Sequence, residues 1–234
     1  MKMSKKIILY HGSEKIIEKP ALGIGNPRND YGLGFYCTQN IDLAKEWACT
    51  EENSGFVNGY EFDHTGLSVM RLSGNEYNIL NWLAILLDNR TFRISNDIAS
   101  EGKRFLLNRF LPRVNDFDVV IGYRANDSYF SFANAFLNNT LSLAQLEKVV
   151  RFGKLGEQTV LISEKSFENI RFTYSEVAEC AVFYPKKSAR DKAAKSAYKK
   201  EHTLQKIEDA VYLMDILRER WEPDDSRLRR NLRR

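Results

Sequence analysis

Short apolar runs alternate with longer amphipathic stretches along the chain, and the short runs predict β-strands. Residues 6–10 are rich in β-branched and aromatic side chains and predict a strand that ends at the polar tripeptide His11-Gly12-Ser13. Residues 14–28 contain two prolines and two glycines, which predict an irregular loop. A turn-like segment between residues 57–62 and residues 67–72 predicts a hairpin. Further strands are predicted at residues 34–38, 117–121, 159–163 and 169–173.

The longer stretches carry apolar residues at helical spacing. Asn40 is a suitable N-cap, and the apolar residues between positions 43 and 48 fall on one face of the helix that it begins. The stretch at residues 76–87 is so apolar that we expect a buried helix. Further helices are predicted at residues 97–111, 129–137 and 143–152, the last of them capped by Ser142.

Composition divides the chain into three parts. Residues 186–222 contain no glycine or proline and carry dense charge beside a narrow apolar stripe, which predicts a long helix or a helical pair packed on the body. We therefore expect a domain at residues 1–185, a helical extension at 186–222 and a basic, disordered tail at 223–234. Strands scattered among helices, with no regular β-α-β alternation, favour an α+β fold.

Overall composition excludes several classes of protein. With 43% hydrophobic and 28% charged residues, the 234-residue chain is neither collagen-like nor wholly disordered. The three cysteines lack the spacing of a zinc site, so we expect reduced thiols and no metal. The longest apolar run, residues 82–87, is far shorter than the roughly 20 residues of a membrane span. We expect a cytoplasmic protein with no membrane partner.

The excess positive charge gathers at the C-terminus. The formal net charge is +4, and the last nine residues hold five arginines and no acid. Such a tail is either a solvated terminus or a segment that neutralises phosphates.

Three polar segments carry the candidate chemistry. The first is the tripeptide at His11, where a glycine lets the backbone approach a ligand closely. The second, Tyr31-Gly32-Leu33-Gly34-Phe35-Tyr36, precedes a strand instead of following one, so it is not a Rossmann dinucleotide motif. The third places Glu157 and Gln158 at the start of a strand, where only one of the two can face a cleft. Each segment alone is also typical of a structural turn or strand entry.

Taken together, these segments resemble the ADP-ribosyltransferase superfamily, in its diphtheria-toxin and poly(ADP-ribose)-polymerase branch. The resemblance rests on Tyr10-His11-Gly12-Ser13, on the block from Gly32 to Thr38, and on Gln158 at the start of a later strand. More narrowly, the chain is similar to a bacterial ADP-ribosyltransferase-like family of unassigned function. The narrower pattern consists of residues 30–36, 44–48, 121–127 and 155–158, and the resemblance covers about residues 6–175.

The resemblance implies a fold of two small antiparallel sheets around an NAD cleft, with flanking helices. It implies that His11 forms a hydrogen bond with the nicotinamide-side ribose, that the Gly12 backbone holds the nicotinamide carboxamide, and that Tyr36 stacks on the nicotinamide ring. Trp47 lies 11 positions after Tyr36, where a second aromatic is expected, and an aromatic face suits a cationic ring. We expect His11 and Tyr36 to make little core contact. The implied set is catalytic His11, Tyr36 and Gln158, with NAD held by His11, Gly12, Ser13, Tyr31, Gly34, Tyr36, Trp47 and Arg124.

The function implied is transfer of ADP-ribose from NAD, as substrate, to a protein or nucleic acid. A bacterial toxin or defence effector, held in check by an inhibitory partner protein, suits the superfamily. Most active members carry Glu where this chain has Gln158, which can orient the ribose but lends no negative charge to a cationic transition state. A catalytically weak or inactive module that binds NAD or ADP-ribose is therefore the alternative. A nucleic-acid adaptor that relies on the arginine-rich tail is a third hypothesis.

Overall fold

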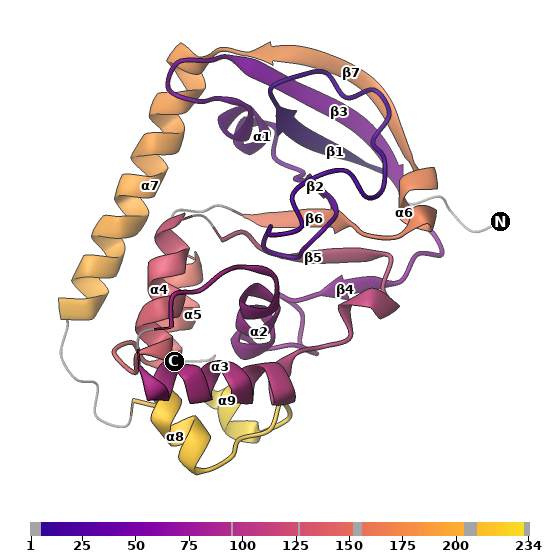
Figure 1. Ribbon diagram of the computed structural model, residues 1–234. Helices are drawn as coiled ribbons and strands as arrows, with labels where there is room; N and C mark the ends of the chain where they lie inside the picture. Colours follow the sequence, from indigo (N-terminus) through magenta and orange to yellow (C-terminus); the bar gives the residue numbers. More distant parts are fainter. Residues whose placement is uncertain (1–5, 95, 126, 152–155, 204–209, 232–234) are drawn as a thin grey trace.

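The protein contains two small β-sheets: the four-stranded sheet lies near the centre of the view, and the three-stranded sheet lies above it, with β7 at the outer edge (Figure 1). The computed structural model describes residues 6–94, 96–125, 127–151, 156–203 and 210–231. The strand order is β1-β3-β7 in the three-stranded sheet and β2-β6-β5-β4 in the four-stranded sheet. The fold is α+β, as the scattered strands and helices predict.

The three-stranded sheet is antiparallel, with β3 in the middle. Its first strand continues past Tyr10, where the apolar run predicted its end, because Gly12 and Ser13 still pair with β3. Gly12 allows α1 to pack closely on this strand, since a Cβ there would lie 1.9 Å from the Ala44 carbonyl oxygen. The strands are β1 (Lys6–Ser13), β3 (Gly55–Asp63) and β7 (Ile170–Ala178).

The four-stranded sheet is mixed, which corrects the expectation of two antiparallel sheets. Its strands β4 and β5 are parallel, whereas β2 and β5 each run antiparallel to β6. The predicted hairpin is also wrong, because β3 and β4 belong to different sheets. Each strand finds a distant partner, and β4 buries Met70 completely in doing so. The strands are β2 (Phe35–Cys37), β6 (Glu157–Leu161), β5 (Val119–Tyr123) and β4 (Val69–Arg71).

Local signals account for several helix boundaries. Asn40 caps α1 as predicted, and its side chain accepts hydrogen bonds from the backbone of Asp42 and Leu43. The apolar helix α2 is buried, and it begins at Ile79 because Asn78 and Asn81 form a capping box there. The helices of the body are α1 (Ile41–Ala48), α2 (Ile79–Asn89), α3 (Asp97–Phe110), α4 (Asp127–Leu137), α5 (Leu143–Arg151) and α6 (Glu164–Glu168), with a 3-10 turn at Val114–Asp116.

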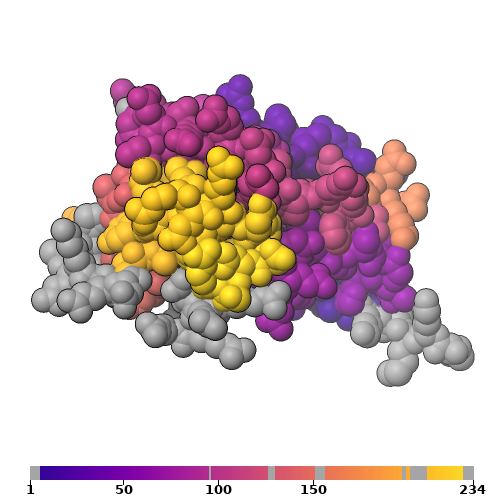
Figure 2. Space-filling model, turned by 90° about the horizontal axis from the view of Figure 1, so that it is seen from below, coloured from indigo at the N-terminus to yellow at the C-terminus, as the bar shows by residue number. Residues whose placement is uncertain are grey.

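The C-terminal part packs on the body, and Figure 2 shows its last described segment, residues 210–231, in yellow across the face seen from below. The long helix begins at Cys180, before the predicted 185/186 boundary, and runs through Pro185. Part of the segment expected to be disordered forms a helix, because Leu228 is buried in the main core and Arg227 forms ion pairs with Asp225 and Glu219. The helices are α7 (Cys180–Thr203), α8 (Leu213–Arg218) and α9 (Ser226–Asn231). None of the helices in the described ranges is both long and apolar enough to cross a membrane.

Candidate functional site

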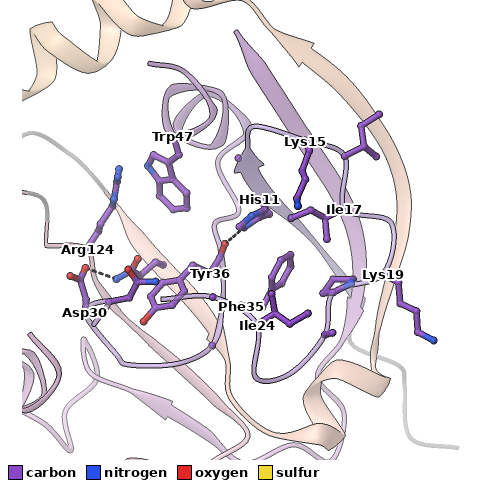
Figure 3. A pocket seen from close by; sticks show the side chains of 18 of the residues that line it. His11, Lys15, Ile17, Lys19, Ile24, Asp30, Phe35, Tyr36, Trp47 and Arg124 are labelled. Carbon is purple, nitrogen blue, oxygen red and sulfur yellow. Dashed lines mark hydrogen bonds between the residues drawn. The ribbon is translucent and has the colours of Figure 1, made fainter. Parts of the chain in front are cut away.

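A pocket of about 680 Å³ lies where the two sheets meet (Figure 3). Strand β1 and helix α1 line it from the three-stranded sheet, and β2 and β6 line it from the four-stranded sheet. The long loop between β1 and β2 covers part of it. Small-molecule sites commonly measure roughly 300–1,000 Å³, so the pocket has room for a nucleotide-sized ligand.

Most residues predicted for the site line this pocket. They are His11, Gly12, Gly34, Tyr36, Trp47, Arg124 and Gln158. Ser13 and Tyr31 do not line it. The Ser13 hydroxyl donates to the Lys15 carbonyl at 2.6 Å, and Tyr31 is buried with its hydroxyl donating to the Tyr123 carbonyl at 2.6 Å. Ser13 thus holds the backbone of Lys15, which lines the pocket, and Tyr31 holds that of Tyr123, next to Arg124.

His11 presents a neutral imidazole to the pocket. Its Nδ1 lies 2.7 Å from the Tyr36 carbonyl oxygen. Because a carbonyl only accepts, Nδ1 carries the proton and Nε2 is left as an acceptor. Burial lowers the pKa of His11, against the opposing effect of that hydrogen bond, and its ring stacks on Phe35 with centroids 4.4 Å apart. The side chain can therefore accept a hydrogen bond from a ligand hydroxyl.

Tyr36 is locked in place by hydrogen bonds to the backbone. Its hydroxyl donates to the Gly32 carbonyl at 2.7 Å and accepts from the Tyr31 N–H at 3.0 Å. Gly32 has φ +73°, a left-handed conformation that favours glycine. The ring also packs against the main core, so the expectation that Tyr36 makes little core contact is wrong.

Gln158, and not Glu157, faces the pocket. Gln158 is buried, and its Nε2 donates to Asp30 Oδ2 at 3.1 Å and approaches the Tyr123 carbonyl at 3.5 Å. Glu157 points to the other face of β6, where it forms an ion pair with Arg71 at 2.9 Å. The alternation of side chains along β6 thus assigns Gln158 to the pocket.

Asp30 lines the pocket, although the sequence patterns gave it no role in the site. Its Oδ1 accepts from Arg90 Nη1 at 2.7 Å, and its Oδ2 accepts from the Ala125 N–H at 2.8 Å as well as from Gln158. Burial raises the pKa of Asp30, whereas these three donors act to lower it. Asp30 begins the Asp30–Tyr36 block quoted for the resemblance, but its arginine lies 60 residues further along the chain. No local pattern connects the two.

Trp47 and Arg124 form the remaining part of the wall. The Arg124 guanidinium lies over the Trp47 ring, 4.5 Å from its centroid. Trp47 Nε1 is shielded from solvent and has no hydrogen-bond partner among the residues that the structure describes. Buried donors are usually satisfied, which makes this nitrogen an exception.

The charge of the pocket lining is positive. Lys15, Lys19, Arg90 and Arg124 line it, against Glu18 and Asp30. An excess of cations in a concave site attracts anionic ligands such as diphosphates. Within the described ranges, no group of three or more His, Cys, Asp or Glu residues is placed to hold a metal ion.

The comparisons with known proteins identify a family without an assigned activity. Neither the search of curated proteins nor the search of solved structures finds a match. One family model matches residues 7–172, a range that includes every residue lining the pocket. The match spans more than half of the chain, and the protein therefore belongs to this family, which is described as a protein of unknown function (DUF3990).

Proposed function

We propose that the protein is an ADP-ribosyltransferase that takes NAD into the pocket between its two sheets. One observation carries the proposal: His11, Tyr36, Trp47 and Gln158, from four separate elements, line a single pocket. The same residues carry the resemblance to the ADP-ribosyltransferase superfamily. The fold of two small sheets with flanking helices is compatible with it.

Each part of NAD finds a chemical counterpart in the pocket. Tyr36 and Trp47 offer aromatic faces to the cationic nicotinamide ring, a contact that is favourable by cation–π attraction. His11 Nε2 accepts from a ribose hydroxyl. The excess of lysine and arginine in the lining compensates the charge of the diphosphate.

The reaction breaks the bond between nicotinamide and ribose. The electron pair of that bond leaves with nicotinamide, which departs neutral, and the ribose carbon develops positive charge. A nucleophile of a protein or nucleic acid then bonds to that carbon and gives up its proton to solvent. Gln158 contributes through the dipole of its amide oxygen and through orientation of the ribose.

A specific observation favours a second candidate, a module that binds NAD or ADP-ribose without turnover. The residue at position 158 is neutral, so its contribution to a cationic transition state is weaker than that of a carboxylate. Both candidates require the same pocket and differ only in the release of nicotinamide.

In a cell, the transferase would act on a macromolecular target. The resemblance favours a bacterial toxin or defence effector whose activity an inhibitory partner protein controls. Such control is consistent with a pocket that opens to the surface beside a long loop.

Calorimetric titration with NAD tests binding, and NADH is the matched control ligand. We expect saturable binding of NAD and weaker binding of NADH, because reduction removes the positive charge and the aromaticity of the nicotinamide ring. NAD labelled in its adenylate part then tests transfer to protein and to nucleic acid in separate incubations. Label on either one supports the transferase, and binding without nicotinamide release supports the module. Absence of NAD binding to the pure protein would refute both candidates.

A further inference from the structure

We infer that Asp30 is a positioning residue that holds the Gln158 amide with its oxygen turned toward the ligand. The inference rests on the proposed function and deepens it, because it assigns the atom of Gln158 that receives the ribose hydroxyl of NAD. Asp30 and Gln158 then act as one unit, in which the carboxylate orients and the amide contacts the substrate.

The contacts of Asp30 determine which end of the amide faces it. An ionised carboxylate only accepts hydrogen bonds. Asp30 receives one from Arg90, one from the Ala125 N–H and one from Gln158. Burial raises the pKa of Asp30, but only the ionised carboxylate accepts from all three donors, and each of the three contacts acts to lower that pKa. Gln158 must therefore present its NH₂ group to Asp30.

The second N–H of Gln158 is directed in the same way. Nε2 approaches the Tyr123 carbonyl at 3.5 Å, and a carbonyl likewise only accepts. Both hydrogens of the amide thus face acceptors of the protein. Gln158 Oε1 accepts no hydrogen bond from the described residues, and the side chain lines the pocket. The oxygen is the atom left to accept from a ligand hydroxyl.

This arrangement explains why position 158 carries an amide. A carboxylate there would bring two negative groups to about the 3.1 Å that now separates Gln158 Nε2 from Asp30 Oδ2. Like charges at such a distance do not both remain ionised. An amide at position 30 facing a carboxylate at position 158 would restore the contact between the two side chains with the roles exchanged, while the Ala125 N–H loses its acceptor in Asp30→Asn and in the double variant alike. The exchange is therefore a direct test of the pair.

The experiment compares Asp30→Asn, Gln158→Glu and the double variant with the parent protein. In Asp30→Asn, an NH₂ group replaces one of the acceptor oxygens, and the Gln158 amide turns to offer its own oxygen. A donor then faces the ribose hydroxyl, and we expect NAD affinity to fall by about tenfold. Gln158→Glu alone is expected to lose a similar factor. The double variant is expected to return to within about threefold of the parent.

The chain supplies a closely matched control in Glu46→Gln. The Glu46 and Asp30 side chains are 3% and 6% exposed, and their arginine partners, Arg190 and Arg90, are 26% and 24% exposed. Glu46 does not line the pocket. Glu46→Gln is expected to lower the melting temperature as much as Asp30→Asn does and to leave NAD affinity unchanged.

A spectroscopic measurement follows the amide itself, without ligand. The side-chain NH₂ signals of Gln158, assigned by their loss in Gln158→Glu, are expected to exchange slowly with solvent in the parent and to shift in Asp30→Asn. Glu46→Gln is expected to leave them in place. Signals that do not respond to Asp30→Asn would overturn the inference.

The outcomes separate this inference from the proposed function. If the parent binds NAD and Asp30→Asn binds it equally well, the inference is overturned and the proposed function stands. If the parent does not bind NAD, the proposed function fails and the inference fails with it. If Asp30→Asn is too unstable to titrate, the double variant decides: recovered NAD affinity supports the inference, and affinity that stays low overturns it.

Discussion

The two sides of the pocket differ in how their polar groups are satisfied. On the side of the four-stranded sheet, Asp30, Tyr36 and Gln158 are held by hydrogen bonds within the protein. On the side of the three-stranded sheet, among the described residues, the His11 side chain forms a hydrogen bond only through Nδ1, and Trp47 Nε1 has no partner. The first side is fixed before a ligand arrives. The second presents polar atoms that the protein itself does not use.

The difference indicates a division of work. Preorganised groups position a reacting centre without rearrangement at the moment of reaction. Atoms without a protein partner are those from which a ligand gains the most, since they exchange only a contact with water or none at all. Substitutions on the four-stranded side should therefore change both stability and turnover. Substitutions on the three-stranded side should change ligand binding more than stability.

The largest effect is expected for Gln158→Ala, which removes the centre of the preorganised side. Nicotinamide release at saturating NAD should fall by about 100-fold, because no acceptor orients the ribose. The free energy of unfolding should fall by about 1–3 kcal/mol, since Asp30 and the Tyr123 carbonyl each lose a donor. Both are measured on the same preparation by product chromatography and thermal melting. Turnover equal to that of the parent would remove Gln158 from the reaction.

The next effect is expected for His11→Gln, on the other side of the pocket. NAD affinity should fall by about tenfold, while the melting temperature changes little. Titration of NAD by calorimetry gives the affinity. A loss of cooperative melting would instead show that His11 acts in the core, through its stack on Phe35.

The pH dependence of His11 has a definite sign. Burial lowers its pKa below the ordinary value of 6.5, so the unfolded chain takes up a proton near pH 6.5 while the folded protein does not. The free energy of unfolding therefore decreases as the pH falls below 6.5, until the lowered pKa is passed. NAD affinity should stay constant through pH 6.5 and decrease only at lower pH, where Nε2 becomes protonated. Asp30 also takes up a proton in acid, so the pH profile of the parent is compared with that of His11→Gln. The difference between these two profiles gives the contribution of His11.

A smaller effect is expected for Tyr36→Phe, which keeps the ring and removes the hydroxyl. The Gly32 carbonyl and the Tyr31 N–H lose their partner, and the free energy of unfolding should fall by about 1–3 kcal/mol. NAD affinity should fall by only about threefold, because the aromatic face remains. Tyr60→Phe is the control, since that buried hydroxyl donates to the Ile17 carbonyl at 2.5 Å and Tyr60 does not line the pocket. Equal loss of affinity in both variants would contradict a role of Tyr36 in the site.

Sequence patterns predicted those parts of the fold that depend on neighbouring residues. The Asn40 cap is found as predicted, and the helix predicted at 97–111 is found at Asp97–Phe110, because both follow from local spacing. The hairpin prediction failed because strand pairing is decided by distant partners, β7 for one strand and β5 for the other. Helix α9 was missed for a related reason: Leu228 becomes buried in a core whose residues come from many parts of the chain.

The candidate site shows the same division. The resemblance located His11, Tyr36 and Gln158, which the structure brings to one pocket. It included Asp30 in a block of the pattern but gave it no role, because a loop acid is usually solvated and only tertiary packing brings Arg90 to it. This contact also changes an expectation. Because most active members of the superfamily carry Glu at this position, the resemblance alone implies that Gln158→Glu is at least as active as the parent, whereas next to Asp30 the added carboxylate is expected to reduce NAD binding.

The smallest effect is expected for Trp47→Phe, which should change NAD affinity without changing the melting temperature. This combination distinguishes the two sides of the pocket most clearly. The substitution removes Nε1, a buried donor that has no partner among the described residues, and this removal stabilises the protein. Because the smaller ring also loses packing contacts, the two effects offset each other and the melting temperature should stay the same. NAD affinity should fall by about twofold to threefold, because the smaller ring gives a weaker cation–π contact.

Trp221→Phe is the matched control: Trp221 also lies under an arginine, but its Nε1 donates to Glu219 at 3.1 Å. That variant should lose stability and keep its NAD affinity. If Trp47→Phe loses as much stability as Trp221→Phe and keeps its NAD affinity, then the residues on the three-stranded side have only a structural role, and the proposed division between the two sides is wrong.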